Sequence, residues 1–278
     1  MLHSLDIDHL IINALKEDMP LGDITTDNLI DAATVTKASL IAKQTGIIAG
    51  LDVAERVFKL LDKEISFKRK IEDGAQVQKG DIIAEIEGNA RVLLKGERTA
   101  LNLLQRLSGI ATKTHEFVDK VVELPVKIVD TRKTTPGLRY LEKYAVKVGG
   151  GSNHRFCLSD GVLIKDNHIA AAGGISKAIA LARNSIPHTI KIEVEVESLE
   201  QVQEALDSKA DIIMLDNMGL EKMKEAVKLI NKQAIVEASG NVNLNTVYDI
   251  ACTGVDIVSV GSLTHSVNAF DISMRIKI

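Results

Sequence analysis

The stretch IKIEVEVESLEQVQEALDSKADIIMLDN, residues 190–217, carries the pattern that decides the fold. It opens with a β-branched run, IKIEVEV (190–196), continues with an amphipathic helical stretch, SLEQVQEALD (198–207), and closes with a second apolar run, DIIML (211–215). A short strand, a helix and another short strand form a βαβ unit, whose two strands run parallel. This stretch therefore predicts an α/β protein.

The same alternation of strand and helix repeats through the C-terminal half of the chain. The other apolar runs are VKIV (126–129), AVKV (145–148), GVLI (161–164), QAIVE (233–237) and VDIVSV (255–260), and further helical stretches cover 175–184, 220–230 and 244–252. About seven βα units predict a parallel sheet with right-handed crossovers that curls into a barrel. An open, doubly wound sheet is the alternative.

The N-terminal third follows a different pattern, which indicates a second domain. Residues 6–17 have the apolar spacing of a helix, and residues 71–90 alternate short apolar runs with glycine-containing turns, as hairpin strands do. Residues 98–122 keep helical spacing over many turns, with Gly109 as a bend or a point of close packing. We interpret this long helix as the passage between two domains.

Composition excludes several functional classes. The 278 residues include 34 Lys and Arg against 38 Asp and Glu, which gives a net charge of −4, and 45% are hydrophobic, so the bulk of the chain is not disordered. An acidic chain with 3% aromatic residues and no Trp is poorly suited to binding nucleic acid. The sequence shows neither a signal peptide nor the ~18-residue apolar run of a membrane span, so we expect a cytoplasmic protein.

Polar residues follow the predicted strands at the point where each strand ends. They include Asp130–Lys133, Lys165–His168, Asp216–Asn217, Glu237–Gly240 and Gly261, and Glu193 and Glu195 lie inside the run IEVEV (192–196). In a βα barrel the carboxyl ends of the strands meet at the face where loops build the active site. A single charge at such a place is more often only a solvated strand end, but the repetition predicts a shared site.

The charges expected at this site indicate its ligands. The cationic side chains are Arg132, Lys133, Arg139, His154, Arg155 and Lys165. Such a dense group in an acidic chain predicts a ligand with several negative groups, because Arg holds carboxylates in a bidentate manner and Lys serves carboxylate and phosphate as a point charge. Glu195 and Asp216, from neighbouring strands, suit Mg²⁺, which takes one or two carboxylates and completes its shell with water and phosphate oxygens.

Two further motifs suit phosphate. EASGN (237–241) and SVGSLTH (259–265) place small residues directly after strands, where backbone N–H groups can approach an anion, and phosphate sites in these barrels lie after the last strands. Nucleotide-binding signatures are absent, since GGGSNHR (149–155) lacks the GK[ST] ending of a P-loop and no GxGxxG opens a helix.

The remaining histidines and the cysteines give weaker signals. His154, in a glycine-rich loop beside Arg155, is a predicted ligand contact, whereas His3, His9, His115 and His188 are predicted at the surface, and His168 and His265 are undecided. Cys157 and Cys252 form no CxxC pair, and Cys157, flanked by apolar residues, is predicted to pack rather than to act as a nucleophile.

Several strings resemble the quinolinate phosphoribosyltransferase family over almost the full length of the chain. They are EDMPLGDITT (17–26), GERTALNLLQRLSGIAT (96–112), DTRKTTPGLRYLEKYAVKVGGGSNHR (130–155), LIKDNHI (163–169), EVEVESLEQ (193–201), IMLDN (213–217), EASGN and GVDIVSVGSLTHS (254–266). The block from residue 130 to 155 is long and highly specific. We see no departure at the positions that the family uses for ligands.

The resemblance implies an N-terminal α/β sandwich domain and an incomplete seven-stranded α/β barrel. The implied boundaries are residues 1–107 with the C-terminal tail 270–278 for the first domain and 108–269 for the second. It also implies a homodimer, sometimes assembled further to a hexamer, in which Arg98 reaches the partner's site. From the sequence alone, Arg98 would be read as a solvated residue at the start of a helix.

The implied reaction is attack of the quinolinate ring nitrogen on C1 of phosphoribosyl pyrophosphate, with release of pyrophosphate and CO₂ to give nicotinate mononucleotide. Lys133, Lys165, Glu195 and Asp216 would be catalytic, the last two also holding Mg²⁺. The substrate-binding residues would be Arg98, Thr131, Arg132, Arg139, His154, Arg155, Lys165, Ser239, Gly240, Ser259 and Gly261. Catalysis would be mainly electrostatic.

Two alternatives stay open. The first is a paralogous phosphoribosyltransferase that acts on another pyridine, or the molybdenum-operon relative of the family; the full set of cations argues against a monocarboxylate. The second is a non-catalytic carrier module, because DGAQVQKGDIIAEIEG (73–88) resembles the turns of biotinyl or lipoyl domains. No Lys in the attachment context follows, which argues against it.

Overall fold

The computed structural model describes residues 4–277, which fold into two compact units. The first consists of the described residues up to Lys113 together with Pro136–Gly149 and the C-terminal segment from Val267, and the second of Thr114–Thr135 and Gly150–Ser266. Among residues 4–277, none of the helices combines the length and the apolar character needed to cross a lipid bilayer.

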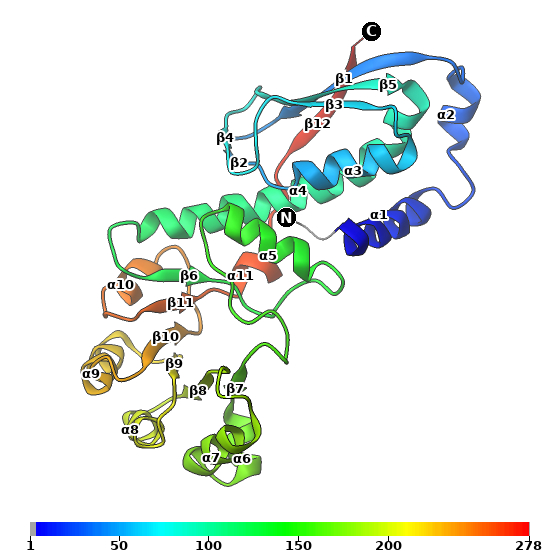
Figure 1. The fold of residues 1–278 in the computed structure, drawn as a ribbon. Helices are drawn as coiled ribbons and strands as arrows, with labels where there is room; N and C mark the ends of the chain where they lie inside the picture. Colours follow the sequence, from blue (N-terminus) through cyan, green and yellow to red (C-terminus); the bar gives the residue numbers. More distant parts are fainter. Residues whose placement is uncertain (1–3, 278) are drawn as a thin grey trace. The chain divides into compact units, whose positions relative to one another are not determined.

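The first unit is built on a four-stranded antiparallel sheet (Figure 1). Its strands, in spatial order, are β12 (Ile272–Lys277), β1 (Val35–Ala42), β5 (Ile82–Asn89) and β3 (Ser66–Arg69). The C-terminal strand therefore pairs with the first strand of the chain, from Lys37 opposite Lys277 to Ala42 opposite Ile272. A second, two-stranded sheet joins β2 (Gly46–Ile47) to β4 (Gln76–Val77).

Helices α1 (Ser4–Asp18), α2 (Ile24–Leu29) and α3 (Leu51–Leu61) complete this unit with the long helix α4 (Ala90–Lys120). The buried face of α3 contains Leu51, Val53, Ala54, Val57 and Phe58. Its Phe58 lies against Gly96 of α4, where an added Cβ would come within 2.8 Å of the ring. Close packing of the two helices thus depends on a residue without a side chain.

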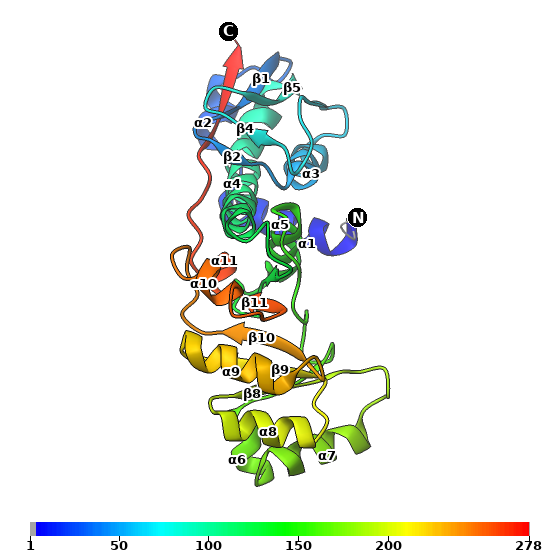
Figure 2. The same ribbon diagram turned by 90° about the vertical axis from the view of Figure 1, so that its left-hand side faces the viewer.

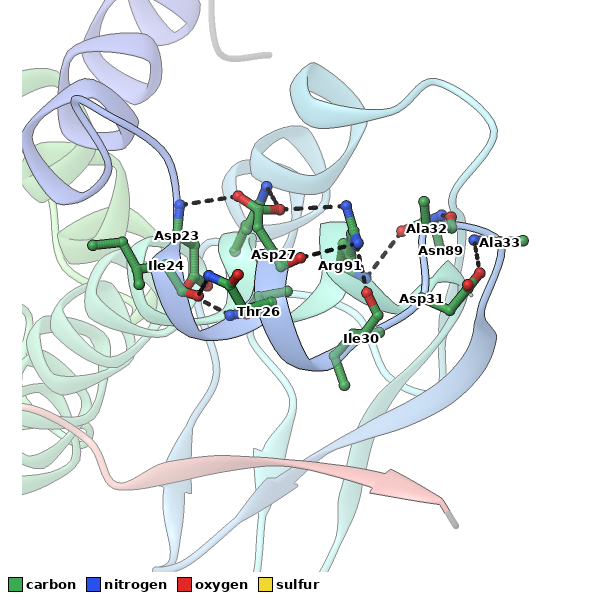
Figure 3. Close-up of polar contacts among 12 residues, drawn as sticks. Asp23, Ile24, Thr26, Asp27, Ile30, Asp31, Ala32, Ala33, Asn89 and Arg91 are labelled. Atoms are coloured by element: carbon green, nitrogen blue, oxygen red, sulfur yellow. Dashed lines mark hydrogen bonds and ion pairs between the residues drawn. The ribbon is translucent and has the colours of Figure 1, made fainter.

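The short helix α2 is anchored by polar contacts on both sides (Figure 3). The Asp23 carboxylate accepts a hydrogen bond from the Thr26 N–H at 3.0 Å, as an N-cap does. Arg91 of α4 donates to the carbonyl oxygens of Ile30 at 2.8 Å and Asp27 at 3.1 Å. The segment is therefore held in place although several of its apolar side chains are exposed.

Gly109 in the middle of α4 is a point of close packing. An added Cβ would lie 2.2 Å from the backbone oxygen of Asn268, so no side chain fits there. We expect Gly109→Ala to lower the free energy of unfolding by about 1–3 kcal/mol, because the backbone must shift. Urea denaturation measures this loss. Gly219→Ala is the control, since a Cβ at Gly219 would meet no atom within 4 Å, and an equal loss in both variants would contradict the explanation.

One predicted strand is wrong. Residues 145–148 (AVKV) lie in helix α5 (Arg139–Val148), whose buried residues Leu141, Glu142, Ala145 and Val146 follow helical spacing. The helix belongs to the first unit. Glu142 is fully buried and accepts from Arg106 of α4 at 2.6 Å, and the Tyr144 hydroxyl donates to Asp73 at 2.7 Å. These long-range contacts stabilise a helix in a stretch whose local sequence predicts a strand.

The second unit contains a parallel sheet of six strands. In spatial order they are β6 (Lys127–Val129), β11 (Ile257–Ser259), β10 (Ile235–Ser239), β9 (Ile212–Asp216), β8 (Ile192–Val196) and β7 (Val162–Ile164). A single parallel bridge between Ser152 and Val129 stands where a seventh strand would lie. The α/β class and the parallel sheet are as predicted, with six strands in place of seven.

Helices connect the strands from β7 to β11, and a short helix follows the last strand of this unit (Figure 2). They are α6 (Asp166–Ala172), α7 (Ile175–Ser185), α8 (Leu199–Asp207), α9 (Leu220–Ile230), α10 (Val247–Ala251) and α11 (Ser262–His265). Val202 of α8 and Met223 of α9 are among the residues that these helices bury. Because the six strands are parallel, their carboxyl ends lie at one edge of the unit.

Candidate active site

A cavity of about 790 Å³ lies at the carboxyl ends of the strands of the second unit. All six strands contribute to it, either by their last residues or by the loops that follow them. The predicted site residues that line it are Thr131, Arg132, Lys133, His154, Arg155, Lys165, Glu195, Asp216, Ser239, Gly240, Ser259 and Gly261. The structure thus brings most of the predicted set into one place.

Arg98 and Arg139 do not line this cavity. Both belong to the first unit, Arg98 as an exposed residue on α4 and Arg139 as the first residue of α5. Their predicted roles in substrate binding stay predictions.

Lys165 and Glu195 form an ion pair across two neighbouring strands. Lys165 directly follows β7 and precedes α6, while Glu195 lies on β8. The side chain of Lys165 is 45% exposed and that of Glu195 is 15% exposed, so the lysine reaches into the cavity and the acid forms its wall. The Lys165 N–H donates to Nδ1 of His168 at 3.0 Å, which gives that undecided histidine a role in starting α6.

Lys133 is positioned by its backbone. Its N–H donates to the Thr131 hydroxyl at 3.1 Å, and its carbonyl accepts from the Thr264 hydroxyl at 2.8 Å. A Cβ on Gly261 would lie 3.1 Å from Cδ of Lys133, so the glycine leaves room for the lysine stem. The exposed ammonium group can therefore extend over the phosphate-suited end of the cavity.

The loop that carries His154 and Arg155 is anchored by a buried acid. Asp130, at the end of β6, is fully buried, and it accepts from Nδ2 of Asn153 at 2.6 Å and from the His154 N–H at 2.9 Å. Both donors belong to the glycine-rich loop that follows α5. A strand end and a loop that are distant in the sequence are thereby joined at the cavity.

We expect Asp130→Ala to lower the free energy of unfolding by about 1–3 kcal/mol, since it leaves these donors without their acceptor. Urea denaturation of the variant beside Asp207→Ala, a change at an exposed acid, measures the difference. If the two variants were equally stable, the loop would have another anchor.

His154 faces two buried carboxylates. Its Nε2 lies 3.2 Å from Glu193 and 3.5 Å from Glu237, and its Nδ1 accepts from the Arg155 N–H at 2.8 Å. Burial disfavours a charged imidazole, but the hydrogen bonds to Glu193 and Glu237 outweigh it and raise the pKa of His154 to about 10. Burial, together with the charge of Glu237, also raises the pKa of Glu193. At neutral pH the imidazole of His154 is therefore protonated.

Both acids are among the polar residues predicted at the strand ends, but their cluster with His154 was not predicted. Glu193 and Glu195 alternate with apolar residues on β8, and Glu237 lies on β10, so a pairing between them through His154 has no signal in the local sequence. The ligand atoms of the three residues lie within 4.8 Å of one another, a spacing that would also suit a metal ion. One oxygen of Glu237, Oε1, is buried without a hydrogen-bond partner.

The cationic side of the cavity is crowded. Arg155 donates to the carbonyl of Gly161 at 3.0 Å, and burial together with the neighbouring Arg132 lowers the pKa of Arg155. Two guanidinium groups that disfavour each other's charge are stabilised by an anion placed between them. This side therefore suits a ligand with more than one negative group.

The structure also shows the environments of the remaining histidines and of Cys157. His9, His115 and His188 are exposed, as predicted, and His3 lies outside the described residues. His265 lines the cavity. Cys157 is partly buried and shares a hydrogen bond with the Ser159 hydroxyl at 3.1 Å, and its predicted packing role stays a prediction.

Two family models match the chain. The one described as "Quinolinate phosphoribosyl transferase, N-terminal domain" matches residues 23–108, and the one described as "Quinolinate phosphoribosyl transferase, C-terminal domain" matches residues 110–275. A "Probable nicotinate-nucleotide pyrophosphorylase [carboxylating]" of Bacillus subtilis is 45% identical over 100% of this chain and 96% of its own length. A protein of the same description from Synechocystis is 46% identical, over 97% of this chain and 92% of its own.

Solved structures agree with these sequence matches. The crystal structure of NadC from Streptococcus pyogenes superposes with a TM-score of 0.97 at 47% identity, covering 100% of this chain and 98% of that one. The nicotinate-nucleotide pyrophosphorylase from Francisella tularensis gives 0.94 at 41% identity, with 98% and 96% covered.

Proposed function

The chain belongs to the quinolinate phosphoribosyltransferase family, and we propose that it transfers the phosphoribosyl group of phosphoribosyl pyrophosphate to quinolinate with decarboxylation. The protein is an enzyme, a phosphoribosyltransferase of NAD biosynthesis. One observation carries the assignment of the residues: a single cavity joins a crowded cationic side, two acids and two loops of small residues. Those three parts match a dicarboxylate, a ribose and its phosphates.

Quinolinate would occupy the cationic side. Arg132 and Arg155 suit its two carboxylates, because a guanidinium donates two parallel hydrogen bonds to a carboxylate, and Lys165 adds a third cation beside them. His154, whose ring faces Glu193 and Glu237, would help to shape the floor of this side. Cations in fixed positions would hold both carboxylates and so orient the ring nitrogen toward the sugar. The entropy of orienting quinolinate is then lost on binding and not in the reaction step.

In the transfer step the ring nitrogen attacks C1 of the ribose. The C1–N bond forms as the bond from C1 to the pyrophosphate oxygen breaks, and the bonding electrons leave with pyrophosphate. Lys133 and Lys165 would stabilise the charge that develops on the departing group, and Glu195 and Asp216 would stabilise the positive charge on the ribose. The protein's contribution is thus positioning and electrostatics.

Loss of CO₂ needs no acid or base from the protein at the carboxylate. The bond from ring C2 to the carboxylate carbon breaks, and its electron pair stays on C2, next to the newly alkylated and positively charged nitrogen. That charge stabilises the pair until C2 takes a proton from water. A desolvated cavity favours this step because the carboxylate loses its hydration.

We propose Mg²⁺ as the cofactor, held by Glu195 and Asp216. These residues fit it: they end neighbouring strands, line the same cavity and offer the hard carboxylate oxygens that the ion prefers. When bound, the ion would neutralise charge on pyrophosphate. Ser239, Gly240, Ser259 and Gly261, at the ends of β10 and β11, would hold the 5′-phosphate.

We further propose a homodimer, capable of assembling to a hexamer, in which Arg98 and Arg139 act in substrate binding and Arg98 reaches the partner's site. In support, the anchored segment around α2 exposes Leu21 by 98%, Ile24 by 81% and Leu29 by 75%, a cluster typical of an interaction surface. A cytoplasmic location is supported by the two free, accessible thiols, which suit a reducing compartment.

Comparison of two substrates tests the assignment. Purified enzyme is given phosphoribosyl pyrophosphate and Mg²⁺ with either quinolinate or nicotinate. We expect turnover of quinolinate to exceed that of nicotinate by at least about 10²-fold, because the monocarboxylate leaves part of the cationic side unpaired. Preference for nicotinate would favour a paralogous enzyme for another pyridine.

A further inference from the structure

The side chain of Asn217 connects two parts of the cavity, Asp216 at the end of β9 and the loop that follows β10. Asn217 follows β9 immediately after Asp216, the proposed Mg²⁺ ligand, and it lies against Gly240, in the proposed phosphate loop. Its position after a strand places it among the polar residues predicted at the shared site, but the sequence gives it no specific role. Its contacts, however, are unusually complete for an exposed asparagine.

The backbone of Asn217 extends the pairing of β9 with β10 by one residue. Its N–H donates to the carbonyl of Ser239 at 3.0 Å, directly after the last register pair, Ser239 with Asp216. Its φ of +52° is the left-handed conformation, which Asn adopts more readily than most residues. The turn aims the Asn217 side chain across the sheet edge toward the neighbouring loop.

The side-chain amide of Asn217 forms one hydrogen bond to Asp216 and one to Asn241. Nδ2 donates to Oδ2 of Asp216 at 2.7 Å, and Oδ1 accepts from Nδ2 of Asn241 at 3.0 Å. A carboxylate can only accept here, which fixes the orientation of the amide, and then only the oxygen is left for Asn241. Aspartate in this place would present an acceptor to an acceptor and a negative charge to a negative charge.

Gly240 is shaped around the same side chain. An added Cβ at Gly240 would lie 2.2 Å from Oδ1 and 2.5 Å from Cγ of Asn217, and the φ of Gly240 is +96°. The next residue, Asn241, also has a positive φ, of +51°. The path of the loop from Ser239 to Asn241 therefore follows the Asn217 amide closely, and Asp216, Asn217, Ser239, Gly240 and Asn241 all line the cavity.

We propose that Asn217 is a positioning residue for phosphoribosyl pyrophosphate, which sets the distance between the carboxylate of Asp216 and the loop Ser239–Asn241. This rests on the proposed function. One ligand must reach both parts at once, its ribose and pyrophosphate near Asp216 and its 5′-phosphate at the loop. A fixed distance between Asp216 and the loop favours binding of a phosphorylated ribose. Quinolinate would bind on the cationic side, so its binding does not depend on this distance.

Two variants separate the two contacts. Asn217→Asp keeps the size and the backbone conformation but replaces the donor to Asp216 by a negatively charged acceptor, whereas Asn217→Gly removes both side-chain contacts without adding charge or backbone strain. Asn231→Gly is the matched control. It is an asparagine of the same left-handed conformation, with φ +43°, at the end of α9, and it does not line the cavity.

Steady-state kinetics are measured with each substrate varied in turn, and the dissociation constant of phosphoribosyl pyrophosphate with Mg²⁺ is measured by calorimetry. We expect both Asn217 variants to raise the KM and the dissociation constant for phosphoribosyl pyrophosphate by about tenfold or more, the loss expected for a hydrogen bond to a charged group. The KM for quinolinate should stay within about twofold, and the control should match the wild type.

The possible failures are distinguishable. If the wild type bound phosphoribosyl pyrophosphate and turned over, but both Asn217 variants kept wild-type values for that substrate, the positioning role would be overturned. An equal rise in both KM values with a lower melting temperature would overturn it as well, since that marks a merely structural residue. A wild type without binding or turnover would instead refute the proposed function itself.

Discussion

Replacement of Lys165 by alanine should reduce kcat/KM for quinolinate by about 10²–10³-fold, the scale of removing one preorganised charge from an active site. Lys165 is the cation through which the quinolinate side of the cavity meets the acidic side, because it pairs with Glu195. Its loss removes a positive charge and also leaves Glu195 unpaired at a site built for anions. Both consequences weaken the binding of an anionic substrate and so lower kcat/KM.

The fold should tolerate this change. The Lys165 side chain is 45% exposed, and ion pairs of exposed side chains contribute only about 0–1 kcal/mol to stability. Lys191→Ala is a suitable control, since this exposed lysine precedes β8 and so lies at the opposite edge of the sheet. If Lys165→Ala kept kcat/KM within about threefold of the wild type, Lys165 would have no place in the catalytic account.

The second large effect is expected for Glu195→Gln. The change keeps the shape of the side chain and removes the charge that would stabilise the ribose and hold Mg²⁺, so kcat should fall by about 10²–10³-fold. Asp216→Asn should act similarly, because the two acids lie on neighbouring strands and line the same cavity. Titration of activity with Mg²⁺ should in addition show a higher half-saturating concentration in both variants.

Glu197→Gln provides the comparison within the same segment. Glu197 follows β8 directly and is exposed, and it does not line the cavity. We expect this variant to keep wild-type kcat and wild-type Mg²⁺ dependence. Equal losses in Glu195→Gln and Glu197→Gln would indicate a general effect of charge near the strand end, which would contradict a specific role for Glu195.

Local sequence was sufficient for the elements that bury one regular face. Strand β8 and helix α9 lie where their apolar periodicity predicts, because period two and period 3.6 each follow from burial of one side, and β9 lies where its continuous apolar run predicts a strand. The polar residues that end these strands, such as Glu195 and Asp216, meet at one cavity for the same reason. Parallel strands bring their carboxyl ends to one edge whatever the intervening helices contain.

Contacts distant in the sequence explain what could not be predicted. Residues 145–148 (AVKV) contain two valines, yet they form the end of α5, because Glu142 of that helix pairs with Arg106 and Tyr144 with Asp73. The cluster of His154 with Glu193 and Glu237 likewise joins a loop to two strands. Local patterns predict which face of an element is buried, but they do not predict which distant residues contact that face.

The most direct test of the account is the fate of the 2-carboxylate of quinolinate. Quinolinate labelled with ¹⁴C at that group is incubated with phosphoribosyl pyrophosphate, Mg²⁺ and the enzyme, and released ¹⁴CO₂ is counted beside nicotinate mononucleotide. The account predicts equal amounts of both, dependent on phosphoribosyl pyrophosphate and abolished by excess chelator. Labelled CO₂ without the sugar substrate, or no nucleotide from the active enzyme, would contradict it.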